Sequence, residues 1–151
     1  MPPERSWIAY IEGKYGIALR RHHATLDIAS LTATQSEIEL VKYHMVRHEG
    51  YRIGEPILAY KGRFGRCWIV DGHTRARVLH DIGATTVPAT LMTSGDPEVD
   101  AELDREAVQA GGGTAMRVQD IPIVDRLGEG SEAWERRRQE LKDRWDAERQ
   151  A

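Results

Sequence analysis

A short stretch of this chain combines the side chains and backbone features that bind phosphate. Residues 69–75, of sequence IVDGHTR, lead from an apolar segment through a glycine into a segment with helical periodicity. The first N–H groups of a helix lack internal acceptors and lie at the positive end of its dipole, so anions bind there. Gly72 has no β-carbon to keep a phosphate from the backbone. Thr74 can donate its hydroxyl, and Arg75 can contact two phosphate oxygens. We predict a strand–turn–helix loop that binds the phosphates of a small ligand, such as a nucleotide.

The same residues also fit a purely structural role. Asp71 can cap the following helix and Gly72 can turn the chain, because Asp-Gly is common where a strand gives way to a helix. Spacing alone favours neither interpretation over the other.

Apolar patterning predicts the elements that position this loop. One helix is expected to begin after Thr34 or Ser36 as its N-cap and to end at Gly50 in the left-handed conformation. Pro88 is expected to place its strand, or that end of the strand, at a sheet edge. The other predicted elements are a short helix and turn in residues 6–20, a strand at 24–28, a hairpin at 56–70, a helix at 74–82 that stops at Gly83, a strand at 86–92 and a helix at 98–109 after Pro97.

This order of elements predicts a mixed α/β or α+β fold with a C-terminal helical extension. We expect a compact domain over residues 1–110, a Gly-rich linker and extended arm over 111–130, and a charged helix over 131–151. In that last helix, an apolar seam is expected to pack on the domain or on a partner, and a homodimer through this helix stays open. The seam consists of Trp134, Leu141 and Trp145.

Composition limits the classes of function. The chain has 151 residues, of which 40% are hydrophobic and 30% charged, which is typical of a globular protein. No apolar run approaches the roughly 20 residues that span a bilayer, and no apolar signal region follows the N-terminus, so we expect no membrane partner and a cytoplasmic location. The net charge of -3 makes nucleic acid an unexpected partner but does not exclude it. The single cysteine, Cys67, can form neither an internal disulfide nor a CxxC metal site.

The segment from about Leu26 to Met92 resembles the domain shared by ParB partition proteins and sulfiredoxin. The residues that carry the resemblance are Leu31-Thr32-Ala33-Thr34-Gln35, Glu55-Pro56-Ile57-Leu58, Val70-Asp71-Gly72-His73-Thr74-Arg75, Gly83 and Val87-Pro88. The family's loop has the form Gly-x-x-Arg, and the Asp-Gly-His-x-Arg variant is most similar to the free-serine kinase branch. The resemblance covers a little under half of the chain. It implies that the loop and the following helix bind nucleotide phosphates, with Mg²⁺ and ATP, ADP or CTP.

Departures from the family pattern narrow the activity. Sulfiredoxin needs a cysteine where this chain has His73, so sulfinic acid reduction is not expected. ParB has an arginine pair in the loop, where Thr74 replaces one member, and no helix-turn-helix pattern follows residue 92. In the serine kinase branch, the position of Thr74 is usually histidine, and a glutamate in an earlier segment is the catalytic base. Glu37 is the nearest carboxylate in the corresponding segment 34–37.

The resemblance therefore implies specific roles. Asp71, Gly72, His73, Thr74 and Arg75 would bind phosphate and nucleotide, with Asp71 orienting the loop or helping to hold Mg²⁺. His73 would contact phosphate or move a proton, and Glu37 would take a proton from an acceptor hydroxyl. A solvated surface position for Glu37 and a loop hydrogen bond for His73 are the alternatives. The activities left open are a small-molecule (free serine-like) kinase or nucleotide hydrolase, a non-catalytic nucleotide-responsive interaction module, and a ParB-like nuclease or DNA-associated protein.

Overall fold

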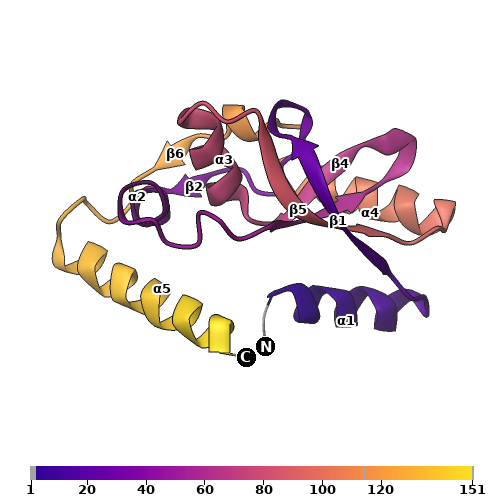
Figure 1. Ribbon diagram of the computed structural model, residues 1–151, viewed down its shortest axis with the longest axis horizontal. Coiled ribbons are helices and arrows are strands. Elements are labelled where there is room, and N and C mark those ends of the chain that lie inside the picture. The colour runs from indigo at the N-terminus through magenta and orange to yellow at the C-terminus, as the bar shows by residue number, and fades with distance from the viewer. Residues whose placement is uncertain (1–2, 114, 151) are drawn as a thin grey trace.

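A four-stranded mixed sheet forms the centre of the computed structural model, which describes residues 3–113 and 115–150 (Figure 1). Its strands are β1 (Arg20–Asp27), β3 (Ile57–Lys61), β4 (Cys67–Asp71) and β5 (Thr86–Thr93), in the order β1-β5-β3-β4. The β5–β3 pair is parallel, and the β1–β5 and β3–β4 pairs are antiparallel. A small parallel pair joins β2 (Ile38–Glu39) to β6 (Ile123–Val124). The chain thus has an α+β fold, as the sequence predicts.

Five α-helices surround these strands in the described residues: α1 (Pro3–Tyr15), α2 (Leu40–Glu49), α3 (His73–Asp81), α4 (Pro97–Ala110) and α5 (Glu132–Gln150). Three short 3₁₀ turns, η1 (Ile28–Ser30), η2 (Arg63–Gly65) and η3 (Val118–Asp120), connect other segments. None of the described helices is both long and apolar enough to cross a membrane.

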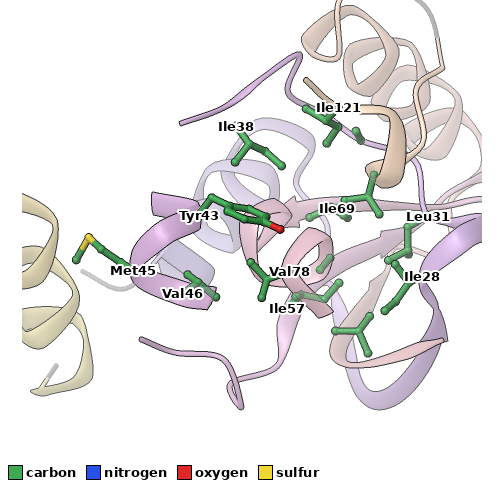
Figure 2. Packing of buried hydrophobic residues seen from close by; sticks show 14 of the residues in the cluster. Ile28, Leu31, Ile38, Tyr43, Met45, Val46, Ile57, Ile69, Val78 and Ile121 are labelled. Atoms are coloured by element: carbon green, nitrogen blue, oxygen red, sulfur yellow. The ribbon is translucent and has the colours of Figure 1, made fainter. Parts of the chain in front are cut away.

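The sheet buries side chains on both faces because its inner strands alternate between two apolar clusters. On β3, Ile57 belongs to the cluster with α2, α3 and α5, whereas Leu58 belongs to the cluster with α1 and α4. Figure 2 shows Ile57, Ile69 and Val78 close together in the first cluster, which places α3 against the sheet. The molecule therefore has three layers, and the loop between β4 and α3 lies at the edge of the middle layer.

The C-terminal third contributes to the same core as the sheet. Trp134, Leu141 and Trp145 are buried in the first cluster, and Met45 points from α2 toward α5 (Figure 2). The expected packing of the apolar seam on the domain is thus observed. In the segment predicted to be a linker and extended arm, Val118 and Ile121 are buried in this cluster too, so this part of 111–130 packs against the domain.

Most of the predicted elements are present, although several differ in detail; for example, the strand predicted at 24–28 begins at Arg20 as β1. The hairpin, the helix before Gly83 and the left-handed Gly50 are confirmed. The predicted N-caps of α2 are wrong: the cap is Glu39, because the preceding residues pair with β6 as strand β2. The strand β5 lies inside the sheet, between β1 and β3. Its pairing with β3 begins only at Ala89, however, so the end of β5 that contains Pro88 pairs with β1 alone. Pro88 therefore lies at a sheet edge although its strand does not.

Candidate functional site

The predicted loop turns sharply at Gly72, between the end of β4 and the start of α3. Gly72 is the N-cap residue of α3 and has a left-handed backbone, with φ 112° and ψ 22°. A β-carbon at this position would lie 2.6 Å from Cγ2 of Ile57 and 2.8 Å from Nη2 of Arg75. Both the backbone angle and the close approach require glycine. The helix N-terminus and the Arg75 side chain are thereby brought next to each other.

Arg75 is a buried cation that is incompletely satisfied. It is only 5% exposed. Its Nη2 donates a hydrogen bond to the Pro56 carbonyl oxygen at 3.2 Å and lies 3.6 Å from Oδ2 of Asp71. Its buried Nε has no hydrogen-bond partner among the described residues. Burial, reinforced by the nearby charge of Arg52, lowers the pKa of Arg75. A charge held in this way is unfavourable for folding and is suited to an incoming anion.

Two adjoining hollows meet at Arg75 and form a single cleft, which we call the Arg75 cleft. Four residues line both hollows: Arg52, Asp71, Arg75 and Trp145. The smaller hollow, about 80 Å³, lies at the start of α3 and also has Gln35, Lys42, Gly72 and Thr74 in its wall. The larger, about 330 Å³, extends along β3 toward α5 and includes Ile57, Leu58 and Thr90. The cleft therefore joins a small polar end to a larger end whose wall mixes apolar side chains with charged ones, among them Glu55 and Glu148.

Arg52 connects α5 to this cleft. Its backbone is left-handed, with φ 58°, which is uncommon for a residue other than glycine and is often found at functional sites. Its Nε donates to Oε2 of Glu55 at 2.7 Å, and its Nη1 donates to Oε2 of Glu148 at 3.3 Å. Its guanidinium also lies 5.8 Å from the ring centroid of Trp145. The cleft is thus partly built from a helix that the loop sequence does not reveal.

A second ion pair holds the same part of α5. Nε of Arg149 donates to Oε1 of Glu55 at 3.0 Å. Sequence reasoning assigned no site role to Glu148 or Arg149, and their only sequence signal was the charge of this helix. Their place in the cleft depends on how α5 packs on α2, which local sequence does not encode.

His73 is in the loop but has a structural role. The residue is 4% exposed, and its Nε2 accepts a hydrogen bond from the backbone N–H of Thr34 at 2.9 Å. Burial, with a smaller contribution from the charge of Lys42, lowers the pKa of His73 to about 3. The ring is therefore neutral near pH 7 and its Nε2 is occupied. The geometry favours the loop hydrogen bond over proton transfer by His73.

His73 also makes the stability of the fold pH-dependent. The folded-state pKa lies below the ordinary histidine value of about 6.5, so acid favours the unfolded chain, which takes up the proton more readily. The contribution of His73 to the free energy of unfolding is fully present above about pH 6.5 and decreases as the pH falls toward 3. Between pH 7 and pH 5 we expect a loss of about 2 kcal/mol from this group. His73→Asn, measured by urea unfolding at both pH values, should remove most of that loss. His48→Asn, at an exposed position on α2, should retain it, and equal losses in all three proteins would contradict the burial argument.

Glu37 does not line the Arg75 cleft. It faces a separate hollow next to β6, where Arg126 donates to both of its carboxylate oxygens, at 3.2 and 2.7 Å. The hydrogen bonds from Arg126 lower the pKa of Glu37, which weakens it as a base. The structure thus brings Asp71, Gly72, Thr74 and Arg75 together in the cleft and leaves the predicted base outside it.

Metal ligands are sparse at the cleft. Within residues 3–113 and 115–150, no three His, Cys, Asp or Glu side chains are grouped so that they could hold a metal ion together. Asp71, whose side chain is partly exposed, is the carboxylate next to the loop glycine.

Comparisons with known proteins find a similar structure and no matching family. No family model matches the chain, and no curated protein matches it. The crystal structure of protein Atu1540 from Agrobacterium tumefaciens is similar, with a TM-score of 0.54 and 14% sequence identity. The match covers 68% of this chain and 62% of that one. At this identity, the likeness shows a shared fold alone.

Proposed function

We propose that the Arg75 cleft binds a nucleotide, with the phosphates at the start of α3. The observation that carries the proposal is the buried Arg75 guanidinium, whose Nε has no hydrogen-bond partner among the described residues. A buried, underpaired charge lowers stability, and a phosphate oxygen would both neutralise it and accept its hydrogen bonds. The resemblance of the loop to ParB/sulfiredoxin domains supports the same assignment.

The shape and charge of the cleft fit such a ligand. Lys42, Arg75 and the hydroxyl of Thr74 surround the smaller hollow, next to the positive end of α3. The larger hollow would take the nucleoside, because the Trp145 ring and apolar β3 side chains form part of its wall.

The resemblance also implies Mg²⁺ with ATP, ADP or CTP, and the cleft fits that mode of binding. Mg²⁺ is commonly held by one or two carboxylates together with substrate phosphates and water, so a closed cluster of protein ligands is not needed. Asp71 would supply the carboxylate here. The metal would neutralise phosphate charge next to Arg75.

The candidate functions differ in whether the bound nucleotide also reacts. For a small-molecule kinase or nucleotide hydrolase, Asp71 is the better-placed carboxylate, because Glu37 is paired with Arg126 outside the cleft. A non-catalytic nucleotide-responsive module is favoured by a different feature, the direct contacts of Arg52 in the cleft with Glu148 and Trp145 of α5. In that case an anion would compete with Glu148 for Arg52 and alter how α5 is held.

Binding and turnover are measured separately. Calorimetric titration with ATP, ADP, CTP and GTP in the presence of Mg²⁺ should show binding of at least one nucleotide. Phosphate release, followed with and without free serine, then separates an enzyme from a binding module. No binding by any of the four, in protein whose circular dichroism shows it folded, would overturn the proposal.

Arg75→Met should separate function from stability. We expect nucleotide affinity to fall about tenfold or more, because at least one charge-assisted hydrogen bond is lost. Stability should be unchanged or rise by about 1 kcal/mol, since an apolar side chain of similar volume replaces an underpaired buried charge. Titration and urea unfolding test the two parts.

The matched control lies two residues further along α3. Arg77 pairs with Asp81 through its Nε at 3.1 Å, and its Nη1 donates to the Ile121 carbonyl oxygen at 2.5 Å. Arg77→Met should therefore lower stability and leave nucleotide affinity nearly intact. The same pattern of effects in both variants would remove Arg75 from the proposed site.

A further inference from the structure

A second surface shares no lining residue with the Arg75 cleft. A groove of about 880 Å³ runs between the β3–β4 turn and α4, lined on the turn by Arg63, Phe64 and Arg66. Its apolar floor includes Ala101 and Val108 of α4. Figure 1 shows α4 and α5 toward opposite ends of the molecule's longest axis, so this groove is separate from the cleft beside α5.

Phe64 is displayed at the tip of this turn in a strained conformation. It is 94% exposed and has φ 59°, a left-handed backbone that disfavours residues other than glycine. The guanidinium of Arg63 lies 4.8 Å from its ring centroid. Neither burial nor backbone preference explains an aromatic residue here, so the display of the ring requires another reason.

The turn is held against α4, which keeps Phe64 in place. The Asp104 carboxylate accepts hydrogen bonds from the backbone N–H of Arg63 at 3.0 Å and from Nε1 of Trp68 at 3.1 Å. Gly62 passes so close to Asp104 that a β-carbon would lie 1.9 Å from Oδ1. The groove is therefore preformed, and the Asp104 charge is used within the fold.

The remaining charges make the groove attractive to an acidic partner. Arg63, Arg66 and Arg105 line it and are exposed, and no carboxylate among the described side chains forms an ion pair with them. By contrast, Glu102 and Glu106 in the same wall lie 3.9 and 3.0 Å from Nζ of Lys14. Among the described residues, the three arginines thus lack a carboxylate partner, whereas the two glutamates share Lys14.

We propose that this groove docks an acidic peptide segment of another protein through an aromatic or aliphatic anchor. The anchor packs on Phe64 and the apolar floor, and the flanking carboxylates pair with the three arginines. Single-stranded nucleic acid fits less well. Only one exposed aromatic ring lines the groove among the described residues, so few bases could stack on it.

A random library of 12-residue peptides, panned on the folded full chain, tests the chemistry of the partner directly. We expect enriched peptides with two or more Asp or Glu residues around an aromatic or aliphatic residue. The best such peptide then serves as the labelled probe for affinity measurements, beside an oligo(dT) of 20 nucleotides. No enrichment, enrichment without acidic residues, or tighter binding of the oligonucleotide would overturn the proposal.

Variants distinguish docking from a structural role. Phe64→Gly suits the left-handed backbone, so it should keep or raise stability while peptide affinity falls about tenfold or more. The double change Arg66→Glu and Arg105→Glu should reduce peptide affinity at least as much, whereas Arg136→Glu on α5 should not. Arg75→Met should leave peptide binding intact. Unchanged affinity in Phe64→Gly would refute the groove as the binding site.

Discussion

Gly72→Ala is expected to lower the free energy of unfolding by about 3 kcal/mol or more. A residue with a β-carbon is strained at φ 112°, and such strain costs about 1–3 kcal/mol. The added carbon would also lie 2.6 Å from Cγ2 of Ile57, whose side chain is buried and cannot move freely. Forcing an extra carbon into a packed site adds about 1–3 kcal/mol. Urea unfolding followed by circular dichroism measures the sum.

Gly83→Ala is the matched control for this change. Gly83 also has a left-handed backbone, with φ 97°, but a β-carbon there would meet no heavy atom within 4 Å. The free energy of unfolding of Gly83→Ala should therefore fall only by the amount that backbone strain costs. Equal losses in the two variants would show that the close packing of Gly72 against Ile57 does not constrain the loop.

Leu141→Ala is expected to lower the free energy of unfolding of the whole domain by about 3 kcal/mol. Leu141 is 0% exposed and belongs to the same apolar cluster as Ile28 and Val41, so its truncation leaves a cavity in the main core. Because α5 shares this core, the loss should appear as one cooperative transition. Tryptophan fluorescence and circular dichroism should report the same urea midpoint.

Arg144→Ala, on the same helix, is the control for Leu141. The side chain of Arg144 is 48% exposed, and its removal should change stability by no more than about 0.5 kcal/mol. If instead α5 unfolded separately in Leu141→Ala while the rest of the fold kept its midpoint, α5 would be an independent appendage. The ion pairs of Arg52 with Glu148 and of Glu55 with Arg149 would then contribute little to stability.

The sharing of Trp145 between core and cleft has a consequence for the proposed function. The ring packs 5.9 Å from that of Tyr51 in the core and lines both hollows of the Arg75 cleft. Binding of a ligand in the cleft and the docking of α5 therefore depend on the same side chain. A nucleotide that binds only the folded state should raise the stability of the whole domain, and above its Kd the gain should grow with the logarithm of its concentration.

Local sequence determined the loop, the hairpin and the turns of this protein. Gly50 and Gly83 end their helices, and Gly72 turns β4 into α3, because each position requires a backbone that glycine adopts readily. Apolar periodicity located the hairpin and α3 because a few neighbouring residues are enough to define an amphipathic face. These features depend on interactions within a few residues of chain.

Only the tertiary structure decided which residues meet at the cleft. Glu37 bonds Arg126, 89 residues away, and the Nε2 of His73 is occupied by the Thr34 amide, 39 residues away. The contributions of α5 and the inner place of β5 in the sheet likewise depend on packing between distant segments. The charge and reactivity of a side chain follow from its burial and its partners, and distant parts of the chain supply both.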